Sequence, residues 1–507
     1  MPHWSLVLSM TQIALAFFWV FSGNLKEKFK TIFKNKAAVI LLSLYLIHII
    51  GLTYSIDFKN GLNDLKIKLP LFLFPIVIAG SEKLTFKQLK IIILVFTGSL
   101  ILKTLYGIVL LTGITGKEIS EMNQLSGKIS HIRFALLINI SIFSVLYLLL
   151  FTNNKRKHKI IFSATVIWLS GFLFILHSLT GWVVFVVLFI LSIINIIQKS
   201  HSGVLKYTGI IVGTAVLISI SSFIIHSVRK YNSTEVIDLT KLETLTQSGN
   251  AYTHFTNNKQ KENGRFVYLY ICKKEMEEEW NKVSSRPYTG KDKLNQNISN
   301  TLIRYLTSKG LRKDKSGIKQ LSKKDIENIE NGLANYIYEN RYAIYPKIYE
   351  VLWQLDHYRS GGSPEGHSVT QRIEFIKTGV KIINDYVWTG VGTGGQKKAY
   401  KEQYNKSHSQ LSDKHRLRAH NQYITVFITL GVFGFLWFLF AFFYLIIKDR
   451  KYKDYLFLMI FTVISLSMLN EDTIETQMGA TIFAFFISLF LFSETKSPQH
   501  STHVQTI

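Results

Sequence analysis

Cysteine is nearly absent from this chain of 507 residues, in which Cys272 stands alone. A lone cysteine excludes an intramolecular disulfide and any CxxC metal or redox motif. The sequence also lacks the motifs DxD, HExxH, GxxxxGK[ST] and GxSxG. Metal-dependent transfer from sugar nucleotides, zinc proteolysis, P-loop ATP hydrolysis and serine hydrolysis therefore have no support. We expect neither a cofactor nor a metal site.

Charge is missing from many long apolar stretches, several of which reach the roughly 20 residues needed to cross a bilayer. The sequence predicts an all-α polytopic membrane protein with about 11 spans. We place them at residues 4–22, 37–54, 67–81, 90–112, 132–151, 160–178, 181–197, 207–226, 421–447, 455–470 and 477–493. Met1 begins almost within the first span, so we also expect a preceding span in a full-length form, for a total of about 12.

Basic residues crowd three of the short connections between spans. They are Lys26, Lys28, Lys30, Lys34 and Lys36, then Lys155, Arg156, Lys157 and Lys159, and finally Lys448, Arg450, Lys451 and Lys453. The positive-inside bias assigns these connections to the cytoplasm. The net charge of +26 therefore reflects membrane topology, and nucleic acid is not an expected partner.

This topology predicts four parts. Residues 1–226 form a transmembrane bundle of about eight spans, and residues 227–419 form a large, mostly helical periplasmic domain. Residues 420–493 add about three spans, and residues 494–507 form a cytoplasmic tail. Within the insert, Ser322 with Asp325 three residues later predicts the start of a helix.

A helix predicted over residues 368–386 carries Arg372 on its apolar face, together with Phe375 and Gly379. An arginine on a buried face needs an anionic partner or a wet cavity, although near a helix start it can also extend to solvent. A glycine-rich run, TGVGTGG at residues 389–395, follows this helix. It does not follow a strand, so it is no dinucleotide fingerprint, and we interpret it as a flexible turn.

His420 stands where the polar insert ends and an apolar helix begins. Helical periodicity from this residue places Phe427, Gly431 and Gly434 within about 40° of its face, which predicts a closely packed seam below the ring. Three cations precede it, namely Lys414, Arg416 and Arg418. The spot therefore attracts an anion, but a histidine at a helix head can also be an ordinary interfacial residue.

Two more ionisable clusters lie at the predicted outer ends of spans. They are His131 with Arg133, and the group Asn470, Glu471, Asp472 and Glu475. Charges at a membrane mouth line a substrate path or are ordinary loop polarity. A base and several arginines at the outer surface suit transfer from a phosphate-activated donor. The base takes a proton from an acceptor hydroxyl, and fixed cations stabilise the departing phosphate.

The pattern of His420 and Asn421, followed after nine residues by Gly431 and then Gly434, resembles the O-antigen ligase and polymerase family of bacterial envelope proteins. Arg372 and the glycine-rich run at residues 389–395, which both precede His420, fit the same pattern. The insert segments ENGRFVYLYIC and TLIRYLTSKGLRKD further resemble a Bacteroidota-type subgroup.

The resemblance implies an inverting, metal-independent glycosyltransferase of the GT-C type in the bacterial inner membrane, with its active site facing the periplasm. The donor would be a glycan on undecaprenyl pyrophosphate, and the acceptor a hydroxyl of lipid A-core or of another glycan. His420 would act on the acceptor hydroxyl and Arg372 on the pyrophosphate. We add Arg416, Arg418, Asn421 and Arg133 as further binding residues.

One departure from the family concerns an arginine at the outer end of an earlier span. This chain has Leu179 there, in the segment HSLTG, so Arg133 or another cation would replace it. Two alternative functions stay open. The first is an O-antigen polymerase with the same fold and donor, and the second is a transporter of an anionic lipid or sugar, which would need paired charges deep inside the spans.

Overall fold

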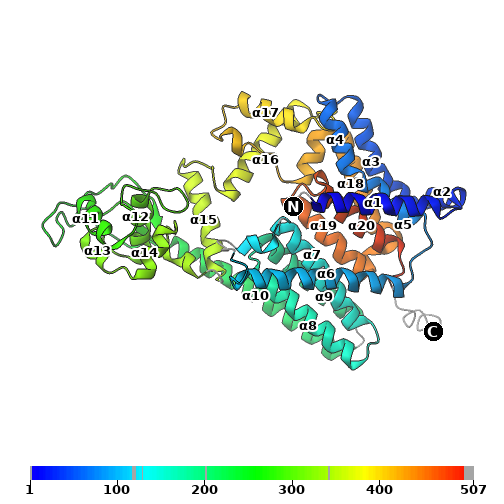
Figure 1. Ribbon diagram of the computed structural model, residues 1–507, viewed down its shortest axis with the longest axis horizontal. Coiled ribbons are helices and arrows are strands. Elements are labelled where there is room, and N and C mark those ends of the chain that lie inside the picture. Colours follow the sequence, from blue (N-terminus) through cyan, green and yellow to red (C-terminus); the bar gives the residue numbers. More distant parts are fainter. Residues whose placement is uncertain (1–2, 117–121, 128, 200–201, 341–342, 496–507) are drawn as a thin grey trace. The chain divides into compact units, whose positions relative to one another are not determined.

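The computed structural model describes residues 3–116, 122–127, 129–199, 202–340 and 343–495. Its helices are shown in Figure 1. The first ten are α1 (His3–Phe21), α2 (Leu25–Lys34), α3 (Lys36–Thr53), α4 (Phe58–Lys68), α5 (Pro70–Ala79), α6 (Phe86–Leu111), α7 (His131–Phe151), α8 (Arg156–Ile175), α9 (Leu179–Lys199) and α10 (Gly203–Asn232), of which α2 and α4 are polar and the others mainly apolar. The last three helices are α18 (Gln422–Ile447), α19 (Tyr455–Asn470) and α20 (Gln477–Phe492).

The protein is an all-α polytopic membrane protein. Among the described residues, seven helices are long and apolar enough to cross a membrane, and an eighth span is reached if the bent pair of α1 and α2 is counted. The prediction of about 11 spans included shorter helices. Pro70 starts a new helix, so α5 has only 10 residues, and α19 and α20 have 16 residues each. The number 11 therefore stays a prediction.

Contacts divide the chain into two compact units, Met1–Gly213 with Pro364–Ile507, and Thr214–Ser363. This division differs from the predicted insert of 227–419, because residues 364–419 belong to the unit of apolar helices. The physical reason is a shared core: Phe375 and Ile382 of α16 (Ser368–Asp385) and Tyr400 of α17 (Gln396–Lys406) pack with Ile428 of α18. Their membrane sidedness stays a prediction.

The unit Thr214–Ser363 has a core of its own around Trp280 and Tyr305. It contains α11 (Lys273–Val283), α12 (Ile298–Lys309), α13 (Lys315–Lys319), α14 (Lys323–Glu330), α15 (Tyr345–Arg359) and an antiparallel ribbon of β1 (Lys261–Glu262) and β2 (Arg265–Phe266). The predicted helix start is confirmed, since Ser322 and Asp325 form a capping box before α14.

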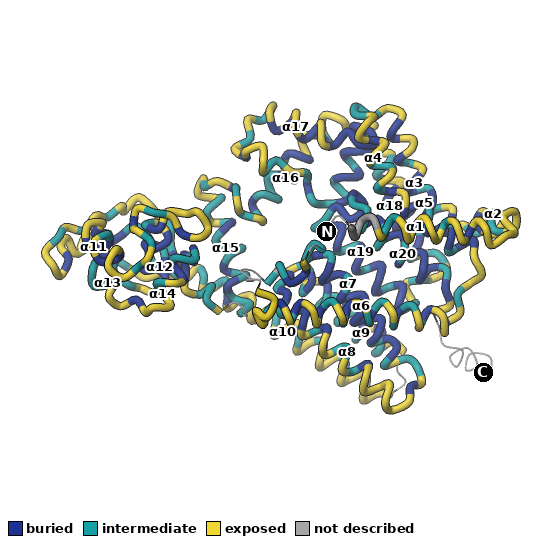
Figure 2. Tube along the Cα trace, in the orientation of Figure 1, coloured by how far each residue is buried: buried dark blue, intermediate teal, exposed yellow. Residues whose placement is uncertain are grey.

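In the other unit, α7 is the most enclosed of the membrane helices. It packs against α6, α8, α9 and α19, and its side chains are buried along most of its length. Helix α20 packs on α5, and α18 packs on α3. In Figure 2 the dark blue of buried residues runs through α7 and α19, whereas α1 and α2 are mainly exposed.

Helix α18 corrects the predicted face below His420. The helix begins at Gln422, two residues later than expected, with Asn421 as its N-cap. It also breaks at Gly431, where φ is 63° and ψ is −169°. Because helical periodicity neither starts at His420 nor continues through Gly431, the stripe joining His420 to Phe427 and the glycines does not form.

The glycine-rich segment is buried and closely packed, in contrast to the flexible turn that we expected. The backbone N–H of Val391 donates to the carbonyl of Ile428, and that of Gly392 donates to the carbonyl of Thr429. Both hydrogen bonds are 2.9 Å long. A Cβ on Gly390 would lie 2.6 Å from the backbone N of Gly431. Close approach of backbones therefore explains the glycines at both places.

We expect Gly431→Ala to destabilise the protein. The new Cβ would lie 2.2 Å from the carbonyl oxygen of Trp388, and the backbone angles belong to a region that only glycine readily adopts. The backbone cost alone is about 1–3 kcal/mol, so thermal unfolding in detergent should show a clearly lower Tm. Gly171→Ala in α8 is the matched control, because a Cβ there meets nothing within 4 Å. Equal Tm values for the two variants would contradict this account.

Candidate functional site

The connection between α19 and α20 carries three carboxylates, and an amide, Asn470, ends α19 directly before it. Asp472 and Glu475 each have side chains that are 2% exposed, and Glu471 is 12% exposed. A buried carboxylate is costly unless cations or hydrogen-bond donors satisfy it. Each of these groups has such partners, and the partners come from segments far apart in the sequence.

Arg372 and Arg133 converge on the carboxylate of Glu471. Arg133, near the start of α7, donates to Oε2 of Glu471 at 3.4 Å, and an Nη of Arg372 lies 4.0 Å from Oε1. Arg372 also donates to Oδ1 of Asn470, whose amide donates to Thr180 at 2.5 Å. Of the two interpretations of Arg372, the structure supports an anionic partner.

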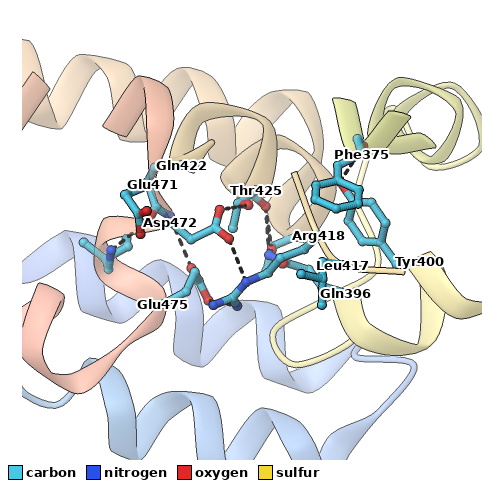
Figure 3. Close-up of polar contacts among 12 residues, drawn as sticks. Phe375, Gln396, Tyr400, Leu417, Arg418, Gln422, Thr425, Glu471, Asp472 and Glu475 are labelled. Carbon is cyan, nitrogen blue, oxygen red and sulfur yellow. Dashed lines mark hydrogen bonds and ion pairs between the residues drawn. The ribbon is translucent and has the colours of Figure 1, made fainter. Parts of the chain in front are cut away.

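Arg418 binds the carboxylate of Asp472. Its Nε lies 2.7 Å from Oδ2 of Asp472, whose other oxygen accepts a hydrogen bond from Thr425 at 2.8 Å (Figure 3). A second nitrogen of Arg418 lies 4.0 Å from Glu475. This arginine therefore bridges two carboxylates of the α19–α20 connection.

Glu475 is held by Lys68, which the sequence analysis did not single out. The Lys68 Nζ donates to Glu475 at 2.6 Å, and Gln422 donates to the other oxygen at 3.2 Å. Burial works to raise the pKa of Glu475, but Lys68 and Arg418 outweigh it and hold the pKa at about 2. Lys68 lies in the segment KIKLP, where a lysine next to an apolar helix was the available signal.

His420 is half-buried in a left-handed backbone conformation, with φ of 49°. Its ring lies beside Phe375, with centroids 5.9 Å apart. The residues on either side are tied to the end of α19 and to the connection that follows it, because the Asn421 amide donates to the carbonyl of Leu469 at 2.9 Å and Arg418 binds Asp472. The segment is thus fixed at both sides of the histidine.

The charged groups that act on His420 are the same carboxylates and arginines described above. Burial lowers the pKa of its ring, Asp472 and Glu471 raise it, and Arg372 and Arg418 lower it, with a net result below 6.5. The imidazole is therefore neutral at neutral pH, which is the form that accepts a proton. Arg372, Asp472 and Glu471 thus act electrostatically on His420, although they are about 50 residues away in the sequence.

Arg416 does not join this group. Its guanidinium donates to the carbonyl of Leu411 at 2.8 Å, to Asn405 at 2.8 Å and to Asp413 at 2.7 Å. Its side chain is thus bound to Asn405 of α17. The prediction that Arg416 binds the anion together with Arg418 therefore has no geometric support.

The position of the missing family arginine lies beside the site. Leu179 is the first residue of α9, and its neighbour Thr180 receives the hydrogen bond from Asn470. Arg133 reaches the same connection through Glu471. The cation that the sequence offered as a replacement is thus next to Arg372. Among the described residues, no group of three or more His, Cys, Asp or Glu side chains is placed to hold a metal ion.

We expect Lys68→Met to lower the Tm substantially, because it leaves Glu475 buried without its nearest cation. Removing one partner of a buried ion pair costs about 3–5 kcal/mol. Lys66→Met is the matched control, since Lys66 is exposed on the same helix. The double variant K68M/E475Q should recover part of the loss, and a double-mutant cycle in detergent-melting experiments measures the coupling. Additive effects of the two substitutions would contradict the pairing.

Residues 332–439 match the family model described as O-antigen ligase, which confirms the resemblance given by the sequence. The match includes Arg372, the glycine segment, Arg418, His420 and Asn421. It excludes Arg133, Lys68 and the carboxylates between α19 and α20. No curated protein matches the chain significantly.

Proposed function

We propose, from the match of residues 332–439 to the O-antigen ligase family model, that this chain is a ligase-type, inverting, metal-independent glycosyltransferase. Its donor is a glycan on undecaprenyl pyrophosphate, and its acceptor is a sugar hydroxyl of lipid A-core. It works in the bacterial inner membrane with its site facing the periplasm. The observation that carries the proposal is the gathering of Arg133, Arg372 and Arg418 on the carboxylates that follow α19, next to the segment of His420, which Asn421 ties to Leu469. The Bacteroidota-type subgroup stays a prediction.

The proposed reaction needs one proton acceptor and one stabilised leaving group. A ring nitrogen of His420 takes the proton of the acceptor hydroxyl, and the hydroxyl oxygen attacks the anomeric carbon of the donor. The bond from that carbon to the pyrophosphate oxygen breaks, and the pyrophosphate leaves with the electron pair. Attack from the opposite side inverts the anomeric centre. The leaving group needs no proton from the enzyme, because cations stabilise its charge.

Arg372 and Arg133 supply those cations in this proposal. Both face the carboxylate of Glu471, so an anionic group is already accommodated between them. A pyrophosphate carries more charge than one carboxylate and offers more oxygens to planar guanidinium groups. It would therefore compete with Glu471 for the two arginines. Asn421 acts less directly, as the cap of α18 and the link to Leu469.

An O-antigen polymerase is the second candidate, because the family resemblance and the donor chemistry apply to it equally. The transporter is less well supported by the contacts. The buried pair of Lys68 and Glu475 lies at the end of α4 and in the α19–α20 connection, and so at helix ends and not midway along a span.

Deletion of the gene, followed by analysis of lipopolysaccharide and carrier-linked glycans, tests the proposal. For a ligase we expect full-length glycan to accumulate on the carrier while the lipid A-core lacks it. One repeat attached to the core would identify a polymerase. Normal lipopolysaccharide with unchanged carrier-linked glycans would reject both. Complementation with the wild-type gene is the control for polar effects.

A further inference from the structure

Helix α2 has a geometry that the glycan-transfer proposal does not use. It is bent by 109° from the end of α1, and after Asn35 the chain enters α3. Helix α1 is mainly apolar and carries no Lys, Arg, Asp or Glu, and α3 is long enough to cross the membrane. A ten-residue helix, about 15 Å long, thus connects two helices that carry long apolar runs, and it turns sharply away from the axis of the first.

One side of α2 is fixed to its neighbours. Ile32 is 1% exposed and packs with Trp19 and Leu42. The Lys28 Nζ donates to the carbonyl of Trp19 at 2.6 Å and lies 5.0 Å from the centre of its ring. These contacts come from both α1 and α3, so side chains hold α2 in its bent orientation relative to α1.

The remaining surface of α2 divides into an apolar and a basic part. Leu25, Phe29 and Phe33 are 38%, 41% and 70% exposed, and the two phenylalanine rings stack. At 100° per residue, these three side chains cover one arc of the helix. The adjoining arc carries exposed lysines at i, i+4 and i+8, namely Lys26, Lys30 and Lys34.

The only carboxylate on α2 does not neutralise this basic arc. Glu27 lies 3.6 Å from Lys30, and both side chains are more than half exposed, so their attraction is weak. Lysines that border an apolar arc can extend their ammonium groups to lipid phosphates while their stems stay in contact with apolar surface. A helix with this division is typical of one lying in the membrane interface.

We propose that α2 is an in-plane anchor that binds the headgroups of anionic phospholipids. Leu25, Phe29 and Phe33 lie among the upper acyl chains, and Lys26, Lys30 and Lys34 contact lipid phosphates. Exposed aromatic rings adjoining a basic arc, at the junction of two apolar helices, support a membrane surface as the occupant. This inference is independent of the glycan-transfer proposal, and its test needs no transfer assay.

The first test measures how deeply each face of α2 lies in lipid. The full chain in a Cys272→Ser background receives one fluorophore, at Phe33→Cys or at Thr31→Cys. Each protein is reconstituted into vesicles of phosphatidylcholine and phosphatidylglycerol whose acyl chains are brominated. Thr31 is exposed on the face opposite the aromatic arc. We expect strong quenching at position 33 and weak quenching at position 31, and equal or reversed quenching would overturn the anchor.

The second test measures headgroup preference at the same fluorophore. Quenching at position 33 is compared when either the phosphatidylglycerol or the phosphatidylcholine is brominated, which gives the local preference for the anionic lipid. In K26Q/K30Q/K34Q this preference should fall by at least about fivefold, the effect of one fully effective lysine. The matched control K273Q/K274Q/K319Q removes three exposed lysines from the other compact unit and should keep the preference. An unchanged preference in the first triple variant would overturn headgroup binding.

Discussion

Replacing His420 with alanine should reduce glycan transfer by at least about 100-fold, because a positioned general base contributes about 10²–10⁴-fold to such a step. The protein should remain in the membrane at normal abundance, since no described hydrogen bond of the fold depends on the ring. The measurement is transfer in vitro from purified lipid-linked glycan to lipid A-core. His415→Ala is the matched control, because His415 lies in the same segment and faces Glu365. Unimpaired transfer by the His420 variant would remove the base assignment.

The pH dependence of transfer should carry the signature of the same residue. A base works only when it is unprotonated, so transfer should fall as the pH drops through the pKa of His420. Burial and the two nearby arginines place this pKa below 6.5, so the acid limb should also lie below pH 6.5. Arg418→Gln should shift that limb to higher pH, since it removes a charge that disfavours the protonated ring.

Arg372→Lys should impair transfer by at least about tenfold, although it keeps the charge. Hydrogen bonds to charged groups contribute about 1.5–3 kcal/mol, and a lysine ammonium cannot reproduce the planar fork of a guanidinium. The shorter reach would also leave Asn470 without its donor. Donor concentration dependence of the transfer rate should show a raised KM for the lipid-linked glycan.

Arg416→Lys is the matched control for Arg372, since the same substitution there affects only contacts with Leu411, Asn405 and Asp413. Its transfer rate and KM should stay close to the wild-type values. If Arg416→Lys impaired donor use as strongly as Arg372→Lys, the assignment of the two arginines would have to be exchanged. Because Arg133 shares Glu471 with Arg372, the variants R133K and R372K should combine non-additively.

Local sequence patterns predicted well those helices that are defined by their apolar composition. The apolar stretches recur as α3, α6–α10 and α18–α20, because the absence of charge over a sufficient length selects a membrane helix. The patterns were less accurate at helix ends. Capping by Asn421 and the left-handed backbone at His420 start α18 later than apolar periodicity suggested.

The candidate site was partly visible in the sequence. His420, Arg372 and the α19–α20 carboxylates each stood out as ionisable groups beside apolar helices. Lys68 and Gln422 did not, because a single lysine or glutamine at a helix end has many harmless explanations. Their roles follow from hydrogen bonds to Glu475, which lies about 400 positions from Lys68 and about 50 positions from Gln422.

The sequence by itself determined that this chain is a helical membrane protein with a polar insert, and that a histidine and several arginines stand at the ends of its helices. Hydrophobic length and residue type are local properties, so they can be read along the chain. The tertiary structure alone decided which charges meet: Arg133 and Arg372 on Glu471, and Arg418 on Asp472. Such pairings depend on how helix ends from distant segments pack, and packing is not encoded in any single stretch.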